Sequence, residues 1–127
     1  MKKFSLSILT IAAITCGLIS SVQAASQDPN ATVVTIQNLN TTEVYADIRK
    51  VIDPLKTNCL PEMKLYPGDI RVVKYGELEQ RCQTDTKFLA DAYGDTHFIV
   101  HTALLANTPG TCTIEHNKFT IKITCVP

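Results

Sequence analysis

Residues 63–75, Met-Lys-Leu-Tyr-Pro-Gly-Asp-Ile-Arg-Val-Val-Lys-Tyr, contain two short strand patterns separated by a strong turn signal. The turn is Tyr66-Pro67-Gly68-Asp69, in which proline suits the second position and glycine the third position of a type II turn. After it, the residues at 70, 72 and 74 alternate with those at 71, 73 and 75, as in a half-buried β-strand. The segment therefore predicts a strand, a tight turn and a second strand.

Similar patterns recur along the chain, each bounded by turn residues. Further strands are predicted at residues 32–36, 44–52, 97–105, 111–115 and 119–126. Residues 56–62 are predicted to form a polar loop, and residues 86–93 fit either two helical turns or a strand. This spacing predicts an all-β fold, a single small disulfide-bonded β-sandwich, with a small β-barrel as the alternative.

The order of these patterns resembles the opening strands of immunoglobulin-like exported domains. Val34-Thr35-Ile36-Gln37-Asn38 is followed by an alternating strand, and Leu65-Tyr66-Pro67-Gly68-Asp69 precedes Ile70-Arg71-Val72. In that class of domain the strands are often joined by an x-Pro-Gly turn. The resemblance covers residues 34–72 and implies a sandwich, but it implies no particular function.

The first residues of the chain have the pattern of an export signal. Lys2 and Lys3 precede an apolar run over residues 4–19, and Val22-Gln23-Ala24 provides small residues for cleavage. We therefore expect a signal peptide at residues 1–24, a flexible lead-in at 25–30 and a single β domain at 31–127. The expected location is the bacterial periplasm or the extracellular medium. Lipid attachment at Cys16 is the alternative, but the residues before it match a lipobox poorly.

The composition argues against several kinds of partner. The chain has 12 basic and 12 acidic residues and a formal net charge of zero, and it contains no basic run. Nucleic acid is therefore not an expected partner, because its binding requires a concentrated positive surface. We also expect no membrane insertion after the signal is removed, since no later apolar stretch is long enough to span a bilayer.

Four cysteines lie in the predicted mature domain, at Cys59, Cys82, Cys112 and Cys125. In an exported chain they predict two disulfides rather than zinc ligands, because no Cys-x-x-Cys pair is present. Sequential pairing, Cys59 with Cys82 and Cys112 with Cys125, is preferred. One argument opposes the second bridge. A tight turn at His116-Asn117 would leave Cys112 roughly 13 Å from Cys125 along the hairpin, which is too far for a disulfide.

The sequence offers little catalytic chemistry and no cofactor motif. The only serine of the predicted mature chain, Ser26, lies in the lead-in, where the fold would not hold a nucleophile rigidly. Asp91, Asp95 and His97 cluster around a glycine and could bind a metal ion, which would make the chain a small metal-binding protein or a metal-dependent hydrolase. Ordinary turn and strand-end roles for these three residues are favoured instead, so no metal site is predicted.

We therefore expect a non-enzymatic exported protein that binds another protein through a strand edge or a disulfide-braced loop, possible roles being a secreted effector or an enzyme inhibitor. A structural envelope component is a further alternative. The candidate binding residues lie in the loop around Cys59 and at two tyrosines, and they are Lys56, Thr57, Asn58, Leu60, Pro61, Tyr45 and Tyr75. Tyrosines are common anchors in protein interfaces. The partner and the oligomeric state are not predicted.

Overall fold

A computed structural model describes residues 27–51, 58–97, 99–117 and 120–127. Within these ranges the strands are β2 (Thr32–Asn38), β3 (Val44–Lys50), β4 (Asn58–Leu65), β5 (Ile70–Lys74), β6 (Phe88–Tyr93), β7 (Val100–Leu105), β8 (Gly110–Asn117) and β9 (Thr120–Val126). Two short 3-10 helices, η2 (Tyr75–Glu77) and η3 (Gln80–Cys82), follow β5. The expected signal peptide and its cleavage site lie outside the described residues.

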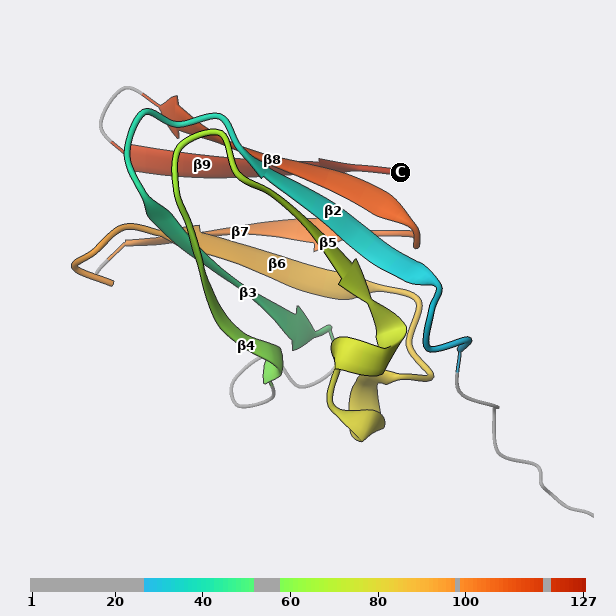
Figure 1. The fold of residues 1–127 in the computed structure, drawn as a ribbon. Helices are drawn as coiled ribbons and strands as arrows, with labels where there is room; N and C mark the ends of the chain where they lie inside the picture. Colours follow the sequence, from blue (N-terminus) through green and yellow to red (C-terminus); the bar gives the residue numbers. More distant parts are fainter. Residues whose placement is uncertain (1–26, 52–57, 98, 118–119) are drawn as a thin grey trace, which may run out of the picture.

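The strands form two four-stranded sheets that pack face to face, which confirms the predicted β-sandwich (Figure 1). One sheet has the order β5-β2-β8-β9 and the other has the order β4-β3-β6-β7. All neighbouring pairs are antiparallel except β2 and β8, which run parallel. β7 and β9, the last strands of the two sheets, lie side by side. The sandwich is therefore closed along that side.

The core lies between the sheets and is built from alternate residues of each strand. Ile36, Ile48, Phe88 and Ile114 are fully buried, one from each of the four central strands. Successive side chains of a strand point to opposite faces, so their sequence neighbours face outward. The outward faces of the two sheets therefore carry the residues that are available for recognition.

The predicted turn at Tyr66–Asp69 is confirmed. The amide of Asp69 donates to the carbonyl oxygen of Tyr66 at 3.0 Å, and Gly68 has a φ of 85°. Glycine adopts this left-handed conformation without the steric cost that a Cβ atom would add. The turn does not close a hairpin. It carries the chain from β4 in one sheet to β5 in the other sheet.

The predicted polar loop at residues 56–62 is wrong from Asn58 onward, because β4 begins there. Cys59 and Leu60 are buried against the core, and β4 pairs with β3 along its length. The pairing is irregular beside Pro61, where the register shifts between Ala46 and Ile48. A proline lacks the amide proton that a regular ladder needs, so it is tolerated on an edge strand such as β4.

Two other ambiguous segments become clear in the structure. Residues 86–93 are not helical, because Phe88–Tyr93 form β6 in the interior of a sheet. The strand predicted at residues 97–105 begins only at Val100, and β7 is an edge strand of its sheet. His97 instead lies in the preceding turn with a φ of 61°. A positive φ is incompatible with a regular strand, which explains the later start of β7.

Both sequential disulfides are present. Cys59 is bonded to Cys82, and Cys112 is bonded to Cys125 with a Cα–Cα distance of 4.0 Å. The objection to the second bridge was wrong, because β8 and β9 still pair at Asn117 and Thr120, whereas the objection placed the turn at His116-Asn117. Cys112 is the direct cross-strand neighbour of Cys125, while Ile121 lies opposite His116.

The first disulfide closes the side of the sandwich between β4 and β5. It ties η3 to β4, and the amide of Glu79 donates to the carbonyl oxygen of Cys59 at 2.8 Å. In the same segment Tyr75 is buried, and its hydroxyl is within hydrogen-bond distance of Asp85 and Thr108. Tyr75 therefore belongs to the core, and its prediction as a surface binding residue is wrong.

Candidate functional site

The outward face of the β4-β3-β6-β7 sheet carries rows of polar and aromatic side chains. In the pairing of β3 with β6, Tyr45 lies opposite Tyr93 and Asp47 lies opposite Asp91. In the pairing of β6 with β7, Tyr93 lies opposite Val100 and Asp91 lies opposite Thr102. Since directly opposed residues share a face of the sheet, these side chains form one continuous surface. We call it the outer face of this sheet.

The two aspartates at the centre of this face are both buried. Asp47 is 9% exposed and Asp91 is 3% exposed. Like charges directly opposite one another on a sheet repel, and burial makes the repulsion stronger. Burial, together with a hydrogen bond to Asp91 and its negative charge, raises the pKa of Asp47 to about 8. Asp47 is therefore largely protonated at neutral pH and shares its proton with Asp91.

Asp91 is held in its ionised form by donors on both neighbouring strands. Burial alone would raise the pKa of Asp91, but hydrogen bonds from Asp47, Arg49 and Thr102 outweigh it and lower that pKa. Arg49 donates through Nε and Nη2 at 2.5 and 3.0 Å, and the hydroxyl of Thr102 donates at 2.6 Å. A bidentate guanidinium–carboxylate pair is among the strongest ionic contacts in proteins. Asp91 is thus fully engaged within the protein, whereas Oδ1 of Asp47 is buried and has no donor among the described residues.

Three rings gather at one end of the outer face. The ring of His97 lies 5.0 Å from that of Tyr45 and 4.8 Å from that of Tyr93, and the two tyrosine rings are 5.9 Å apart. His97 reaches this position from a turn in which its backbone adopts a positive φ. Its backbone amide donates a hydrogen bond to the carbonyl oxygen of Gly94, and its Nδ1 lies 2.7 Å from the carbonyl oxygen of Asp95. Such strained residues concentrate at functional sites.

Glu62 on β4 connects the rings to the rest of the face. Its Oε1 accepts a hydrogen bond from the hydroxyl of Tyr93 at 3.0 Å and lies 3.1 Å from Nε2 of His97. Burial and the bond to Glu62 raise the pKa of Tyr93, which therefore stays protonated and acts as a donor. The backbone carbonyl of Asp95 and the carboxylate of Glu62 raise the pKa of His97.

The contact between His97 and Glu62 predicts a pH effect that can be measured by NMR. Because the pKa of His97 is higher in the folded state, the contact stabilises the fold below the unfolded-state value of about 6.5. That contribution is lost as the pH rises through the folded pKa. The Glu62→Gln variant should lower the pKa of His97, whereas the control Glu115→Gln, on the other sheet, should leave it unchanged. Equal effects of both variants would contradict this assignment.

The outer face is hollowed beside these groups. The hollow has a volume of about 400 Å³ and is lined by Asp47, Arg49, Asp91, Tyr93, His97, Val100 and Thr102. Val100 and Leu104, on the edge strand β7, are 48% and 52% exposed. The surface thus combines a recess with aromatic, cationic and exposed aliphatic side chains, which is the composition of protein-interface anchors.

The structure does not bring the predicted metal candidates together as ligands. Asp91 is paired with Arg49, and Asp95 contacts His97 through its backbone carbonyl. Among the described residues, no three histidine, cysteine or carboxylate side chains are placed to hold a metal ion.

The other predicted binding residues are dispersed. Lys56 and Thr57 lie outside the described residues. Asn58 and Pro61 are exposed on β4, but Leu60 is only 5% exposed and packs in the core, so it cannot contact a partner. Tyr45 lies on the outer face described above, and so does Asn58, which pairs with Arg49 across β3 and β4. Four residues of this face, Asp47, Arg49, Glu62 and Tyr93, are not predicted from the sequence, although an aspartate in the middle of an alternating strand pattern is a visible signal.

Comparison with protein-family models, curated proteins and solved structures finds no match to this chain. The molecule is defined by its own fold, which is a small β-sandwich with two disulfides. The two disulfides are compatible with an oxidising compartment. No helix among the described residues is long and apolar enough to cross a membrane.

Proposed function

We propose that this chain is an exported, non-enzymatic protein that binds another protein through the outer face of the β4-β3-β6-β7 sheet. The observation that carries the proposal is the hollow on that face. Tyr93, His97 and Arg49 line it, and Leu104 is exposed on β7, the edge strand that also contributes Val100 to the lining. A recess of this kind can receive a side chain of the partner, while the aliphatic rim excludes water around it.

The chemistry of the face favours binding over catalysis. Asp47 and Asp91 share a proton, and Asp91 is also paired with Arg49, so neither carboxyl is poised to act on a substrate. A general base has to reach the proton that it removes, and these two side chains are almost completely buried. The network is better suited to hold the tyrosine and arginine side chains in fixed positions. Rigid anchors reduce the entropy that binding costs.

The opposite face of the sandwich has a different composition. The outward residues of the β5-β2-β8-β9 sheet include Thr35, Gln37, Thr111, Thr113 and Thr124, together with the exposed aliphatic residues Ile70, Val72 and Val126. Threonine is under-represented among binding hot spots, whereas tyrosine and arginine are enriched. The two faces therefore provide a comparison within one molecule. The outer face of the β4-β3-β6-β7 sheet should contact the partner, and the outward face of the β5-β2-β8-β9 sheet should not.

Site-specific photo-crosslinking can test this assignment. A photoreactive phenylalanine analogue would replace Leu104 on the proposed face, or Ile70 on the other sheet, in cells that produce the protein. These two side chains are similarly exposed, at 52% and 61%. We expect a discrete protein adduct from position 104 and none from position 70. Identical adducts from both positions, or none from position 104, would contradict the proposed binding face.

A further inference from the structure

The three rings at one end of the outer face form a patch with the carboxylate of Glu62. We call this patch, which consists of Tyr45, Tyr93, His97 and Glu62, the aromatic end of the outer face. Tyr93 is only 6% exposed, whereas the side chains of His97 and Glu62 are 46% and 44% exposed and Tyr45 is half-buried. The accessible surface of the aromatic end is therefore made of two rings and a carboxylate.

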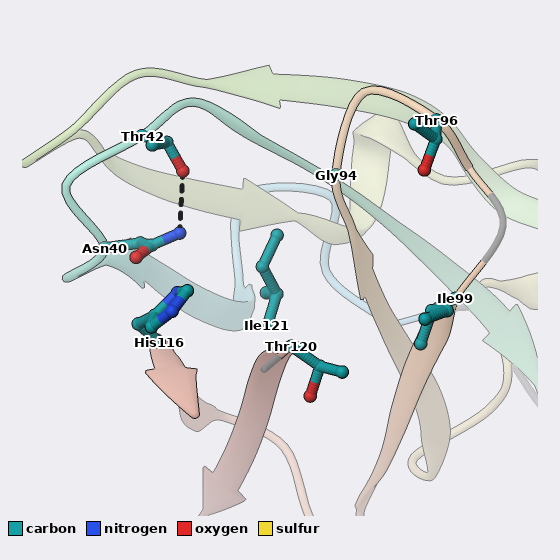
Figure 2. Close-up of a pocket in the computed structure, with 8 residues that line it drawn as sticks. All are labelled: Asn40, Thr42, Gly94, Thr96, Ile99, His116, Thr120 and Ile121. Carbon is teal, nitrogen blue, oxygen red and sulfur yellow. Dashed lines mark hydrogen bonds between the residues drawn. The ribbon is translucent and has the colours of Figure 1, made fainter. Parts of the chain in front are cut away.

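The turn that carries His97 is braced by the neighbouring sheet. The amide of His97 donates to the carbonyl oxygen of Gly94 at 3.1 Å. A Cβ atom at Gly94 would lie 3.4 Å from Cδ1 of Ile121, so the backbone of the turn packs closely on β9. Figure 2 shows Gly94 and Ile121 among the residues that line a second hollow, at the end of the sandwich. The ring of His97 is thus held in place before a partner arrives, which reduces the entropy that binding costs.

Negative charge predominates around the aromatic end. Partial burial raises the pKa of the Tyr45 hydroxyl, although the charge of Lys64 opposes this shift. Three carboxylates raise it further, and they are those of Glu43, Asp95 and Glu62. Lys64 is itself paired with Glu43 at 3.2 Å. Because three carboxylates act here against one lysine, this end of the face attracts a cationic group.

The carboxylate of Glu62 has one oxygen available to such a group. Its Oε1 accepts a hydrogen bond from the hydroxyl of Tyr93 and contacts Nε2 of His97. Its Oε2 accepts no hydrogen bond from the described residues. An ionised carboxylate can accept at both oxygens. A donor from a partner can therefore bind Glu62 without displacing Tyr93.

A guanidinium group matches these features better than an ammonium group. It is planar, it stacks on aromatic rings, and it donates to a carboxylate while it remains charged. We propose that the aromatic end binds an arginine side chain of the partner protein, which donates to Oε2 of Glu62 and stacks on the rings of Tyr45 and His97. This inference rests on the proposed function, because it names the group that the outer face recognises. Arginine is also enriched among the residues that contribute most to protein binding.

The charge of His97 should control this contact. A neutral imidazole allows the guanidinium to stack, whereas an imidazolium repels it and competes for Glu62. The groups that face the ring come from three strands and from its own turn, and they are Tyr45, Tyr93, Glu62 and Asp95. The carbonyl of Asp95 and the carboxylate of Glu62 raise the pKa of His97, so its protonated form predominates at about pH 6. Arginine binding should therefore weaken as the pH falls.

Two-dimensional NMR of the isotope-labelled protein tests the proposal with three blocked tripeptides. Their central residue is arginine, lysine or citrulline, which has the shape of arginine without its charge, and a glycine lies on each side. We expect the arginine peptide to shift the signals of His97 and Glu62 saturably at millimolar concentration, and to bind more tightly at about pH 7.5 than at about pH 6. Equal binding of the lysine or citrulline peptide, equal binding at both pH values, or no saturable shift would overturn the proposal.

Matched variants separate recognition from a general effect on the fold. The Glu62→Gln variant loses the charge but can still accept the hydroxyl of Tyr93, so it should bind the arginine peptide roughly twofold to fivefold more weakly. The control Glu115→Gln, on the other sheet, should keep the wild-type affinity. The His97→Gln variant should lose most of the difference between the two pH values. An unchanged affinity in the Glu62→Gln variant would contradict the proposed contact.

The crosslink at position 104 keeps this inference separate from the proposed function. Leu104 lies in the row of Leu89 and Arg49, away from the row of Tyr45 and Tyr93. We expect the Glu62→Gln change to reduce the yield of the adduct from position 104. If the adduct forms with an unchanged yield, the face binds the partner but not through an arginine at Glu62. If position 104 gives no adduct at all, the proposed function itself is wrong.

Discussion

Replacing all four bridged cysteines with alanine should leave most of the protein unfolded at about 37 °C. The two bridges span sequence separations of 23 and 13 residues. Closing loops of these lengths in the unfolded chain contributes about 3 kcal/mol each. Their combined loss of about 6 kcal/mol is comparable with the total stability of about 5–15 kcal/mol that is usual for a domain. Urea unfolding followed by circular dichroism measures the loss.

The two single-bridge variants should differ in where the structure loosens. Without Cys112–Cys125, β8 and β9 keep their backbone ladder, so the stability falls but the hairpin remains protected from hydrogen exchange. Without Cys59–Cys82, η3 is released from β4, and the amide of Glu79 should exchange much faster than the core. If the four-alanine variant lost less than about 2 kcal/mol, the native contacts rather than the bridges would hold the sheets together.

Local patterns were sufficient to predict the sandwich. The alternation in β3 and β5 correctly predicted strands in both places, and in the structure Val44, Ala46 and Val73 point into the core. The x-Pro-Gly turn was equally reliable, because only a few backbone conformations suit Pro67 followed by Gly68. Both signals depend on residues that are close in sequence. They need no knowledge of which strand lies beside which.

Features that depend on long-range pairing were predicted poorly. β4 reads as a polar loop because Asn58, Pro61 and Glu62 are polar or break strands, and only its pairing with β3 and the bridge from Cys59 make it a strand. The register of β8 with β9 was misplaced by the assumption that His116-Asn117 forms the turn. Tertiary context commonly overrides local propensity in sheets.

The candidate site was missed for the same reason. Asp47 and Asp91 are 44 residues apart in the sequence, but the register of β3 with β6 makes them direct cross-strand neighbours. Nothing local to either residue indicates that the two carboxyls face each other. His97 was identified as a candidate, yet its true neighbours are Tyr45, Tyr93 and Glu62 rather than Asp91. A pairing of strands, and not a motif, builds this surface.

The second large effect should come from replacing one of these two aspartates with asparagine. Asp91→Asn removes the negative charge that pairs with Arg49 and should cost about 3 kcal/mol, the lower end of the range for breaking a buried pair, because Arg49 is partly exposed. Asp47→Asn should cost much less, since its amide can donate to Asp91 as the protonated carboxyl does. Urea unfolding of both variants at neutral pH gives the comparison. Equal losses would show that the shared proton does not reside on Asp47.

The same pair predicts how stability depends on pH. Between about pH 4 and pH 8 the folded protein keeps a proton on Asp47 that the unfolded chain has released. Unfolding therefore releases this proton, and the stability should fall as the pH rises through that window, by at most about 1.4 kcal/mol per pH unit from this group. The Asp47→Asn variant has no such proton to release. Its free energy of unfolding, relative to that of the wild type, should therefore be higher at pH 8 than at pH 5. The control Glu115→Gln, an exposed carboxylate on β8 of the other sheet, should keep the wild-type slope, because it leaves both Asp47 and Asp91 unchanged.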